Sequence, residues 1–74
     1  MEVKVYSTPT CPYCKMVKEY LASKGVSYRD IDVASNSQAA EEMVKISGQM
    51  GVPVVVINGQ AVIGFDKSKI DSLL

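Results

Sequence analysis

Two cysteines, Cys11 and Cys14, are the residues whose type and spacing point most directly to chemistry. They are the only cysteines among 74 residues, and Pro12 and Tyr13 separate them. A disulfide between them would close almost no loop and would add little stability, because the entropic benefit of a cross-link grows with loop length. Small secreted domains held by disulfides usually have about four to eight cysteines spread along the chain. The spacing therefore favours a reactive pair over a structural bridge.

The position of the pair at the start of a helix predicts different roles for the two thiols. Pro12 is suited to the first residue of a helix, which places Cys11 at the N-cap. There its sulfur faces free backbone N–H groups and the positive end of the helix dipole, and both favour the thiolate. We expect Cys11 to be the exposed nucleophile and Cys14, inside the helix, to resolve a mixed disulfide formed at Cys11. Lys15 and Lys18 add positive charge, although exposed lysines contribute little at cellular ionic strength.

Other roles for a cysteine pair fit the sequence less well. A structural zinc site needs four ligands, whereas this chain has two cysteines and no histidine. No metal site is predicted, although any exposed dithiol can take soft ions such as copper(I). Two inert core cysteines are an alternative, but Pro12 argues against it because it is placed to start a helix. Cys-x-x-Cys beside a β-α-β pattern is typical of thiol–disulfide exchange.

The hydrophobic pattern predicts seven elements in the order β-α-β-α-β-β-α. They are a strand over 2–6, a helix from Pro12 to Gly25, a strand over 26–33, a helix over 35–48, two strands over 54–57 and 60–63 joined by Asn58-Gly59, and a last helix capped by Asp66. The first β-α-β unit should be a right-handed parallel crossover, and the hairpin adds two antiparallel strands. The fold class is therefore α/β, with a four-stranded mixed sheet between helices, and residues 1–74 form one domain.

Within these helices, some residues are expected to cap the ends and others to face the core. Ser35 and Gln38 have capping-box spacing, and Glu41 can pair with Lys45 one turn on. The expected inward faces are Cys14, Val17 and Leu21 with Met16 and Tyr20 beside them, then Ala39, Met43 and Ile46, and finally Ile70, Leu73 and Leu74.

Composition and charge exclude several classes of partner. Residues are 47% hydrophobic and 22% charged, as in an ordinary globular domain. Eight basic and eight acidic residues cancel without a run of one sign, so neither nucleic acid nor an anionic membrane is expected as a partner. The first residues lack the pattern of a signal peptide, and no apolar run reaches the roughly 20 residues of a membrane helix. We expect a cytoplasmic protein, in a compartment where thiols stay reduced.

The run Thr10-Cys11-Pro12-Tyr13-Cys14 resembles the glutaredoxins, whose usual active site is C-P-Y-C. The likeness covers nearly the whole chain, through residues 23–26, 41–43 and 47–49 and into Val52-Pro53 ahead of the hairpin. The resemblance implies a thioredoxin-like fold and a thiol–disulfide oxidoreductase with a redox-active Cys11–Cys14 disulfide. It also implies glutathione as co-substrate, no tightly bound cofactor, and a monomer that acts on disulfide-containing proteins.

By the same resemblance, the peptide bond before Pro53 is expected to be cis and to lie against Cys11. The backbone of Val52 would then pair with the peptide-like part of glutathione, as a short β-addition. Tyr13 would form one wall of that groove. The simpler interpretation of Tyr13 is a half-exposed aromatic residue in the first helical turn.

Four further residues are implied for the glutathione site: Gln49, Gly64, Asp66 and Lys67. Gln49 matches a position that often contacts the glycine end of glutathione. Gly64 and Asp66, with nearby backbone amides, would receive a carboxylate, and Lys67 would contact one. Asp66 as a plain N-cap and Lys67 as a solvated side chain are the simpler alternatives.

The sequence departs from the glutaredoxin pattern at two places. Thr8 stands where glutaredoxins often have a lysine, and Gly64-Phe65-Asp66-Lys67 replaces a Gly-Gly-x-Asp run. The Gly-Phe pair resembles the small redoxins that are reduced by thioredoxin reductase and serve ribonucleotide reductase, although those usually lack C-P-Y-C. Phe65 is then expected to be a packing or partner-contact residue. A metal or iron–sulfur carrier is a further alternative, against which Pro12 counts because cluster-binding glutaredoxins usually replace that proline.

Overall fold

A computed structural model describes residues 2–74 of the chain. It contains the seven predicted elements in the predicted order: β1 (Val3–Ser7), α1 (Pro12–Ser23), β2 (Arg29–Asp32), α2 (Ser37–Ser47), β3 (Val54–Ile57), β4 (Gln60–Ile63) and α3 (Lys67–Leu73). The strands form one sheet in the order β2-β1-β3-β4, in which β1 and β2 are parallel and the other pairs are antiparallel. The predicted α/β fold with a mixed sheet is confirmed.

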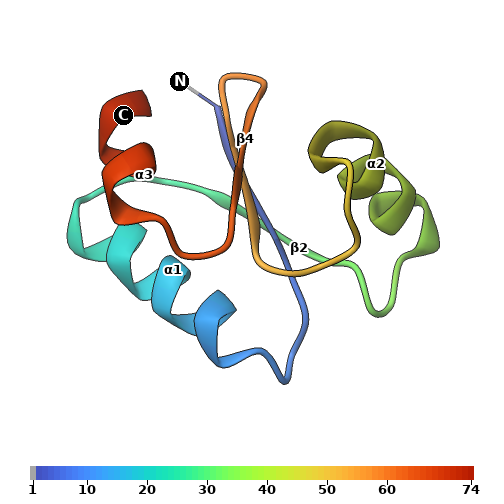
Figure 1. Cartoon of the computed structure of the whole chain (residues 1–74). Coiled ribbons are helices and arrows are strands. Elements are labelled where there is room, and N and C mark those ends of the chain that lie inside the picture. Colours follow the sequence, from blue (N-terminus) through green and yellow to red (C-terminus); the bar gives the residue numbers. More distant parts are fainter. Residues whose placement is uncertain (1) are drawn as a thin grey trace.

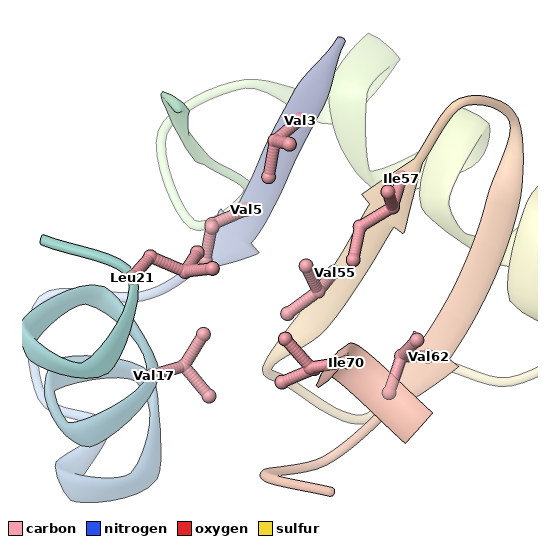
Figure 2. Close-up of a cluster of buried hydrophobic side chains, with 8 residues drawn as sticks. All are labelled: Val3, Val5, Val17, Leu21, Val55, Ile57, Val62 and Ile70. Carbon is pink, nitrogen blue, oxygen red and sulfur yellow. The ribbon is translucent and has the colours of Figure 1, made fainter. Parts of the chain in front are cut away.

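The sheet lies between two helical layers, with α1 and α3 on one face and α2 on the other (Figure 1). The first face holds a buried cluster that joins α1, α3 and three strands, shown in Figure 2: Val3, Val5, Val17, Leu21, Val55, Ile57, Val62 and Ile70. The second face buries a smaller cluster beneath α2: Tyr6, Ala39, Met43, Val54 and Val56. All four residues of β3 are buried, because this central strand has helices on both sides.

Local signals predicted the ends of α1 and the hairpin turn correctly. Pro12 is the first residue of α1, and Cys11 is its N-cap in extended conformation. The chain leaves α1 through Gly25, whose φ of 71° suits glycine. Asn58 and Gly59 both have positive φ, as a tight turn between β3 and β4 requires. The cysteine pair therefore sits at the start of α1, directly after β1.

Three local predictions were wrong in detail. The second strand is shorter than 26–33 and covers only Arg29–Asp32. The cap of α2 is Asn36 and not Ser35, because the Oδ1 of Asn36 accepts a hydrogen bond from the N–H of Ala39 at 3.1 Å. Within residues 2–74, Glu41 forms no ion pair with Lys45.

The inward faces of the helices are narrower than predicted. Met16 is 46% exposed, Ile46 42% and Leu74 37%. Only Ala39 and Met43 of α2 are buried in the second cluster. Ile46, in the last turn of that helix, does not pack into this cluster. A helix on a small sheet buries one stripe, and side chains beside that stripe meet solvent. Along the described chain, 2–74, no helix combines the length and apolar character needed to span a membrane.

Candidate active site

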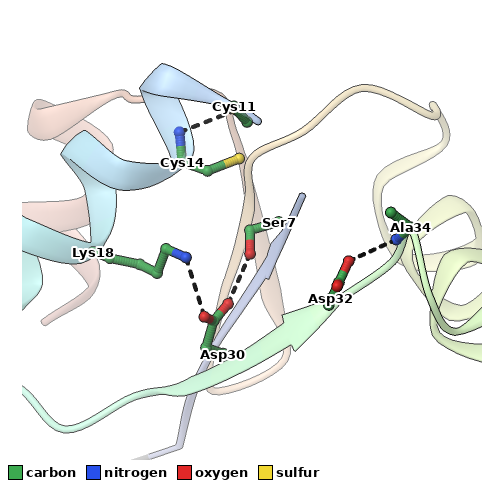
Figure 3. A network of polar contacts seen from close by, with 7 residues as sticks. All are labelled: Ser7, Cys11, Cys14, Lys18, Asp30, Asp32 and Ala34. Carbon is green, nitrogen blue, oxygen red and sulfur yellow. Dashed lines mark hydrogen bonds and ion pairs between the residues drawn. The ribbon is translucent and has the colours of Figure 1, made fainter. Parts of the chain in front are cut away.

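Cys11 lies at the N-terminus of α1, with its sulfur turned toward the backbone of the first turn. The N–H of Cys14 donates a hydrogen bond to the Sγ of Cys11 at 3.1 Å (Figure 3). The N–H of Cys11 is held by the carbonyl of Thr8 at 3.4 Å. Both cysteines are free thiols, Cys11 partly exposed and Cys14 fully buried. Cys11 is thus the more accessible of the two thiols, as its predicted role as nucleophile requires.

The loop before β3 brings a distant backbone segment against Cys11. The Sγ of Cys11 lies 3.9 Å from the carbonyl oxygen of Val52, 41 residues away in sequence. The predicted cis bond between Val52 and Pro53 is present, and Pro53 is buried. Within residues 2–74, the N–H of Val52 has no hydrogen-bond partner, whereas the carbonyl of Pro53 accepts from the N–H of Gly64 at 2.9 Å. A peptide-like ligand beside Cys11 could therefore use the N–H of Val52.

The environment of Cys14 keeps it protonated while Cys11 is free. Burial, together with the hydrogen bond and negative charge of Cys11, raises the pKa of the Cys14 thiol to about 11, and burial is the largest of these causes. The backbone of Thr8 and the charge of Lys18 act in the opposite direction but do not compensate. Near neutral pH, Cys11 is therefore the thiol that is available to attack.

We expect iodoacetamide at pH 7 to alkylate Cys11 and to leave Cys14 almost unmodified in the folded protein. With a pKa of about 11, about one Cys14 thiol in ten thousand is ionised at pH 7, and that fraction rises about tenfold per pH unit. Mass spectrometry of the two cysteine positions over time measures both rates. In guanidinium chloride the two thiols should react at similar rates. Equal rates in the folded protein would contradict the assignment.

A polar network that the sequence reasoning missed lies behind the cysteines. The buried hydroxyl of Ser7 donates to the Oδ1 of Asp30 at 2.7 Å, and the Nζ of Lys18 lies 3.1 Å from the Oδ2 (Figure 3). Burial alone would raise the pKa of Asp30, but the hydrogen bonds from Ser7 and Lys18 and the lysine charge lower it overall. Two signals were visible in the sequence: an acidic residue within a strand, and a lysine four residues after Cys14.

Most of the other residues implied for the glutathione site already form hydrogen bonds within the protein. Gln49 folds back on Gly51, donating to its carbonyl at 3.0 Å and accepting from its N–H at 2.7 Å. The Oδ1 of Asp66 accepts from the N–H of Lys69 at 3.2 Å, so Asp66 is the N-cap of α3. Tyr13 is 61% exposed at the start of α1. The structure thus gathers the cysteines with the segment 52–53, while Gln49 and Asp66 make local contacts.

Phe65 and Lys67 lie against Tyr20 of α1. The ring of Phe65 meets that of Tyr20 edge-on at 5.6 Å, and it packs against the first core cluster. The Nζ of Lys67 lies 5.4 Å from the centroid of each of these rings. Phe65 is therefore a packing residue in this structure, one of the two roles expected for it.

Two hollows border the loop that carries the cysteines. The larger one, of about 480 Å³, is apolar, and its lining includes Thr8, Met43, Val44 and Met50. The smaller one, of about 220 Å³, lies over the polar network and is lined by residues that include Ser7, Lys18 and Asp30. Sequence reasoning anticipated neither hollow. Across residues 2–74, no three side chains of His, Cys, Asp or Glu gather as a metal site would require.

Comparison with protein families and curated proteins gives one consistent result. Residues 3–62 match the family model described as Glutaredoxin. A glutaredoxin-like protein of 8.6 kDa in the rubredoxin operon of Clostridium pasteurianum is 50% identical over 72 residues, which are 97% of this chain and 96% of that protein. Glutaredoxin 3 of Escherichia coli is 42% identical over 64 residues, covering 86% of this chain and 77% of its own length.

Solved structures agree with the sequence relatives. The thioredoxin-like protein BC3987 has a TM-score of 0.92 and 36% identity, covering 99% of this chain and 100% of its own. The glutaredoxin-like NrdH-redoxin of Escherichia coli, described as having a thioredoxin-like activity profile, has a TM-score of 0.88 and 26% identity and covers 100% of this chain and 96% of its own. The family match ends at residue 62, before the Gly64–Lys67 segment that departs from the usual pattern.

Proposed function

This chain belongs to the glutaredoxin family and is a thiol–disulfide oxidoreductase, and from that premise we propose that it reduces glutathione mixed disulfides and protein disulfides with glutathione as electron donor. The observation that carries the proposal is the setting of Cys11. Its sulfur is partly exposed, accepts the N–H of Cys14 at 3.1 Å, and lies 3.9 Å from the carbonyl oxygen of Val52. We place this activity in the cytoplasm, where glutathione and reduced thiols are maintained.

The first step is attack by the Cys11 thiolate on one sulfur of a substrate disulfide. A bond forms between Cys11 and that sulfur, the substrate S–S bond breaks, and the second substrate sulfur leaves as a thiolate that takes a proton from water. The N–H of Cys14 stabilises the attacking anion, as a helix N-terminus does. The free N–H of Val52 holds the backbone next to the substrate sulfur, as β-addition does.

The second step depends on how the first one changes Cys14. Once Cys11 is part of a mixed disulfide, it no longer carries the negative charge that raises the pKa of Cys14. Cys14 then ionises more readily, attacks Cys11, and expels the bound substrate sulfur as a thiol. The resulting Cys11–Cys14 disulfide is reduced by two molecules of glutathione, which leave as glutathione disulfide. For a glutathione mixed disulfide, a second glutathione can replace Cys14 as the resolving thiol.

The proposed glutathione site extends from the cysteine loop along the segment 52–53. Tyr13, Val52 and Pro53 contact the central part of glutathione. Lys67 pairs with one of the carboxylates of glutathione. To do so it gives up its cation–π contacts with two aromatic rings, and such contacts are weak at an exposed position. Gln49, Gly64 and Asp66 complete the proposed glutathione site. Each already has a hydrogen-bond partner in its own chain, so a ligand contact there either replaces that bond or uses the remaining hydrogen-bonding capacity of the residue.

A second candidate function uses the same thiols with a different electron donor. Here thioredoxin reductase reduces the disulfide, and the protein passes electrons to ribonucleotide reductase or a similar enzyme. Thr8, Phe65 and Lys67, which replace residues of the usual glutathione site, favour this candidate. So does the likeness to an NrdH-redoxin that has a thioredoxin-like activity profile.

The electron donor is tested by steady-state reduction of a small glutathione mixed disulfide, followed by NADPH loss. One assay supplies glutathione with glutathione reductase, and the other supplies thioredoxin reductase alone. We expect turnover with glutathione, because the partly exposed sulfur of Cys11 and the free N–H of Val52 suit a peptide-like ligand. Turnover with thioredoxin reductase alone would replace the glutathione proposal with the second candidate.

The same assay tests the proposed contact of Lys67 with glutathione. Lys67→Ala should raise the KM for glutathione severalfold at unchanged kcat, because a charge-assisted contact is worth about 1.5–3 kcal/mol at most and less when exposed. Lys69→Ala is the matched control, since Lys69 is exposed on the same helix and meets Asp66 only through its backbone. The same KM in both variants would remove Lys67 from the site.

A further inference from the structure

Lys18 is placed behind the resolving thiol and is held there by two other elements. It follows Cys14 by one helical turn, so both side chains lie on one face of α1. Its Nζ is bound to Asp30 of β2 at 3.1 Å, and Asp30 is bound in turn to Ser7 of β1 at 2.7 Å. The Lys18 side chain is only 25% exposed, against 48% for Asp30. Figure 3 shows Lys18 and Ser7 directed toward the same carboxylate, beside Cys14.

The groups around Cys14 leave Lys18 as the cation that acts on it. Burial is the main effect on this thiol and raises its pKa, and the hydrogen bond and charge of Cys11 raise it too, whereas the backbone of Thr8 and, to a smaller extent, the charge of Lys18 lower it. From β2 come Asp30, which binds Lys18, and Asp32, whose carboxylate accepts the N–H of Ala34 at 2.9 Å. The segment 52–53 contributes no ionisable side chain. Of β1, the neutral Ser7 contacts Asp30, whereas Lys4 pairs with Glu2 and Tyr6 lies in the second cluster with its hydroxyl on Glu42.

We propose that Lys18, held in place by Asp30 and Ser7, is a positioning residue that stabilises the Cys14 thiolate during the resolving step. This inference rests on the proposed function of Cys14. In that step the Cys14 thiol loses its proton to water, and its sulfur bonds to the sulfur of Cys11. The bond from Cys11 to the substrate sulfur breaks, and the substrate leaves as a thiolate that is then protonated. The nearby ammonium group compensates part of the cost of forming an anion at a buried sulfur.

Lys15 provides the matched control on the same helix. It follows Cys14 directly, so it lies on a different face of α1, and its side chain is exposed. It forms no ion pair within residues 2–74. Replacing Lys15 removes the same charge from the same helix while the Lys18–Asp30 pair remains. A difference between the two lysines therefore reports position and not net charge.

The test is stopped-flow mixing of the reduced protein with one equivalent of 5,5′-dithiobis(2-nitrobenzoate) at a series of pH values. Attack by Cys11 releases the first coloured thiolate, and attack by Cys14 on the mixed disulfide releases the second. Lys18→Met should shift the pH profile of the second phase upward by about half a pH unit to one unit. At pH 7 a smaller fraction of Cys14 is then ionised, which slows the second phase, while the higher basicity of the remaining thiolate makes it a better nucleophile and offsets part of the loss. The net slowing should be about two- to fourfold. Lys18→Arg should restore the profile, and Lys15→Met should match the wild type.

The outcomes separate this inference from the function on which it rests. If the second phase is absent in the wild-type protein, Cys14 is not the resolving thiol and the proposed function fails. If that phase is present and has the same pH profile in Lys18→Met and Lys15→Met, only the role of Lys18 is overturned. If the circular dichroism spectrum shows that Lys18→Met is misfolded, an Asp30→Asn variant replaces it in the comparison with Lys18→Arg and Lys15→Met. Asp30→Asn releases Lys18 from its ion pair, so the pH profile of the second phase should change in that variant too.

Discussion

Replacing Cys11 with serine is expected to abolish disulfide reduction, with a loss of about three orders of magnitude or more. A serine hydroxyl is not ionised at neutral pH and is a far weaker nucleophile than a thiolate. The N-cap position would be kept, since serine is itself a good cap, so α1 should remain folded. The loss would therefore report chemistry and not stability.

The control for this experiment is Cys14→Ser. It should retain reduction of glutathione mixed disulfides, in which a second glutathione resolves the intermediate, and should lose reduction of protein disulfides, which needs both thiols. Steady-state rates with one substrate of each kind measure the two effects. Full activity in Cys11→Ser would assign the nucleophile to Cys14, against the burial and the raised pKa of that thiol.

Leu21→Ala is expected to destabilise the fold by about 2–5 kcal/mol. Leu21 is fully buried in the cluster that joins α1 to the sheet and to α3, as Figure 2 shows. Alanine favours helix as much as leucine does, so the loss comes from packing and from the cavity that remains. A chain of this length has a total stability of roughly 4–11 kcal/mol. The substitution would therefore leave a marginal protein.

Thermal unfolding followed by circular dichroism measures this effect. A fall in Tm of roughly 10–30 °C is expected, since about 1 kcal/mol corresponds to 4–8 °C in a domain of this size. Met16→Ala is the matched control, because Met16 lies on the same helix but is 46% exposed. It should change stability by less than about 0.5 kcal/mol. A similar fall in both variants would mean that the first cluster does not carry the packing assigned to it.

The parts of the fold that sequence reasoning predicted correctly depend on short-range signals. Pro12 and Gly25 mark the two ends of α1, and Asn58 with Gly59 marks the turn of the hairpin. Each works through the backbone preferences of one or two residues. Where two such signals compete at neighbouring positions, as with Ser35 and Asn36 before α2, the prediction was off by one residue. Both residues are good caps, so local preference alone does not choose between them.

The sequence by itself determined the chemistry of this protein: two thiols one helical turn apart, the first at a helix N-terminus. That arrangement follows from residues within a single turn of one another, so neighbouring side chains and backbone groups are enough to specify it. The likeness to glutaredoxins added the cis bond at Val52-Pro53, which is present in the structure.

Only the tertiary structure decided which groups surround the two sulfurs. Val52 reaches Cys11 because β1 and β3 pair side by side, across 41 residues of sequence. Asp30 reaches Lys18 and Ser7 because the parallel register of β1 and β2 places Asp30 opposite Val5, close to Ser7. Sheet register is chosen by the burial of whole strand faces, and not by the residues that come to share a site. The burial of Cys14, and with it the raised pKa of that thiol, follows from that packing.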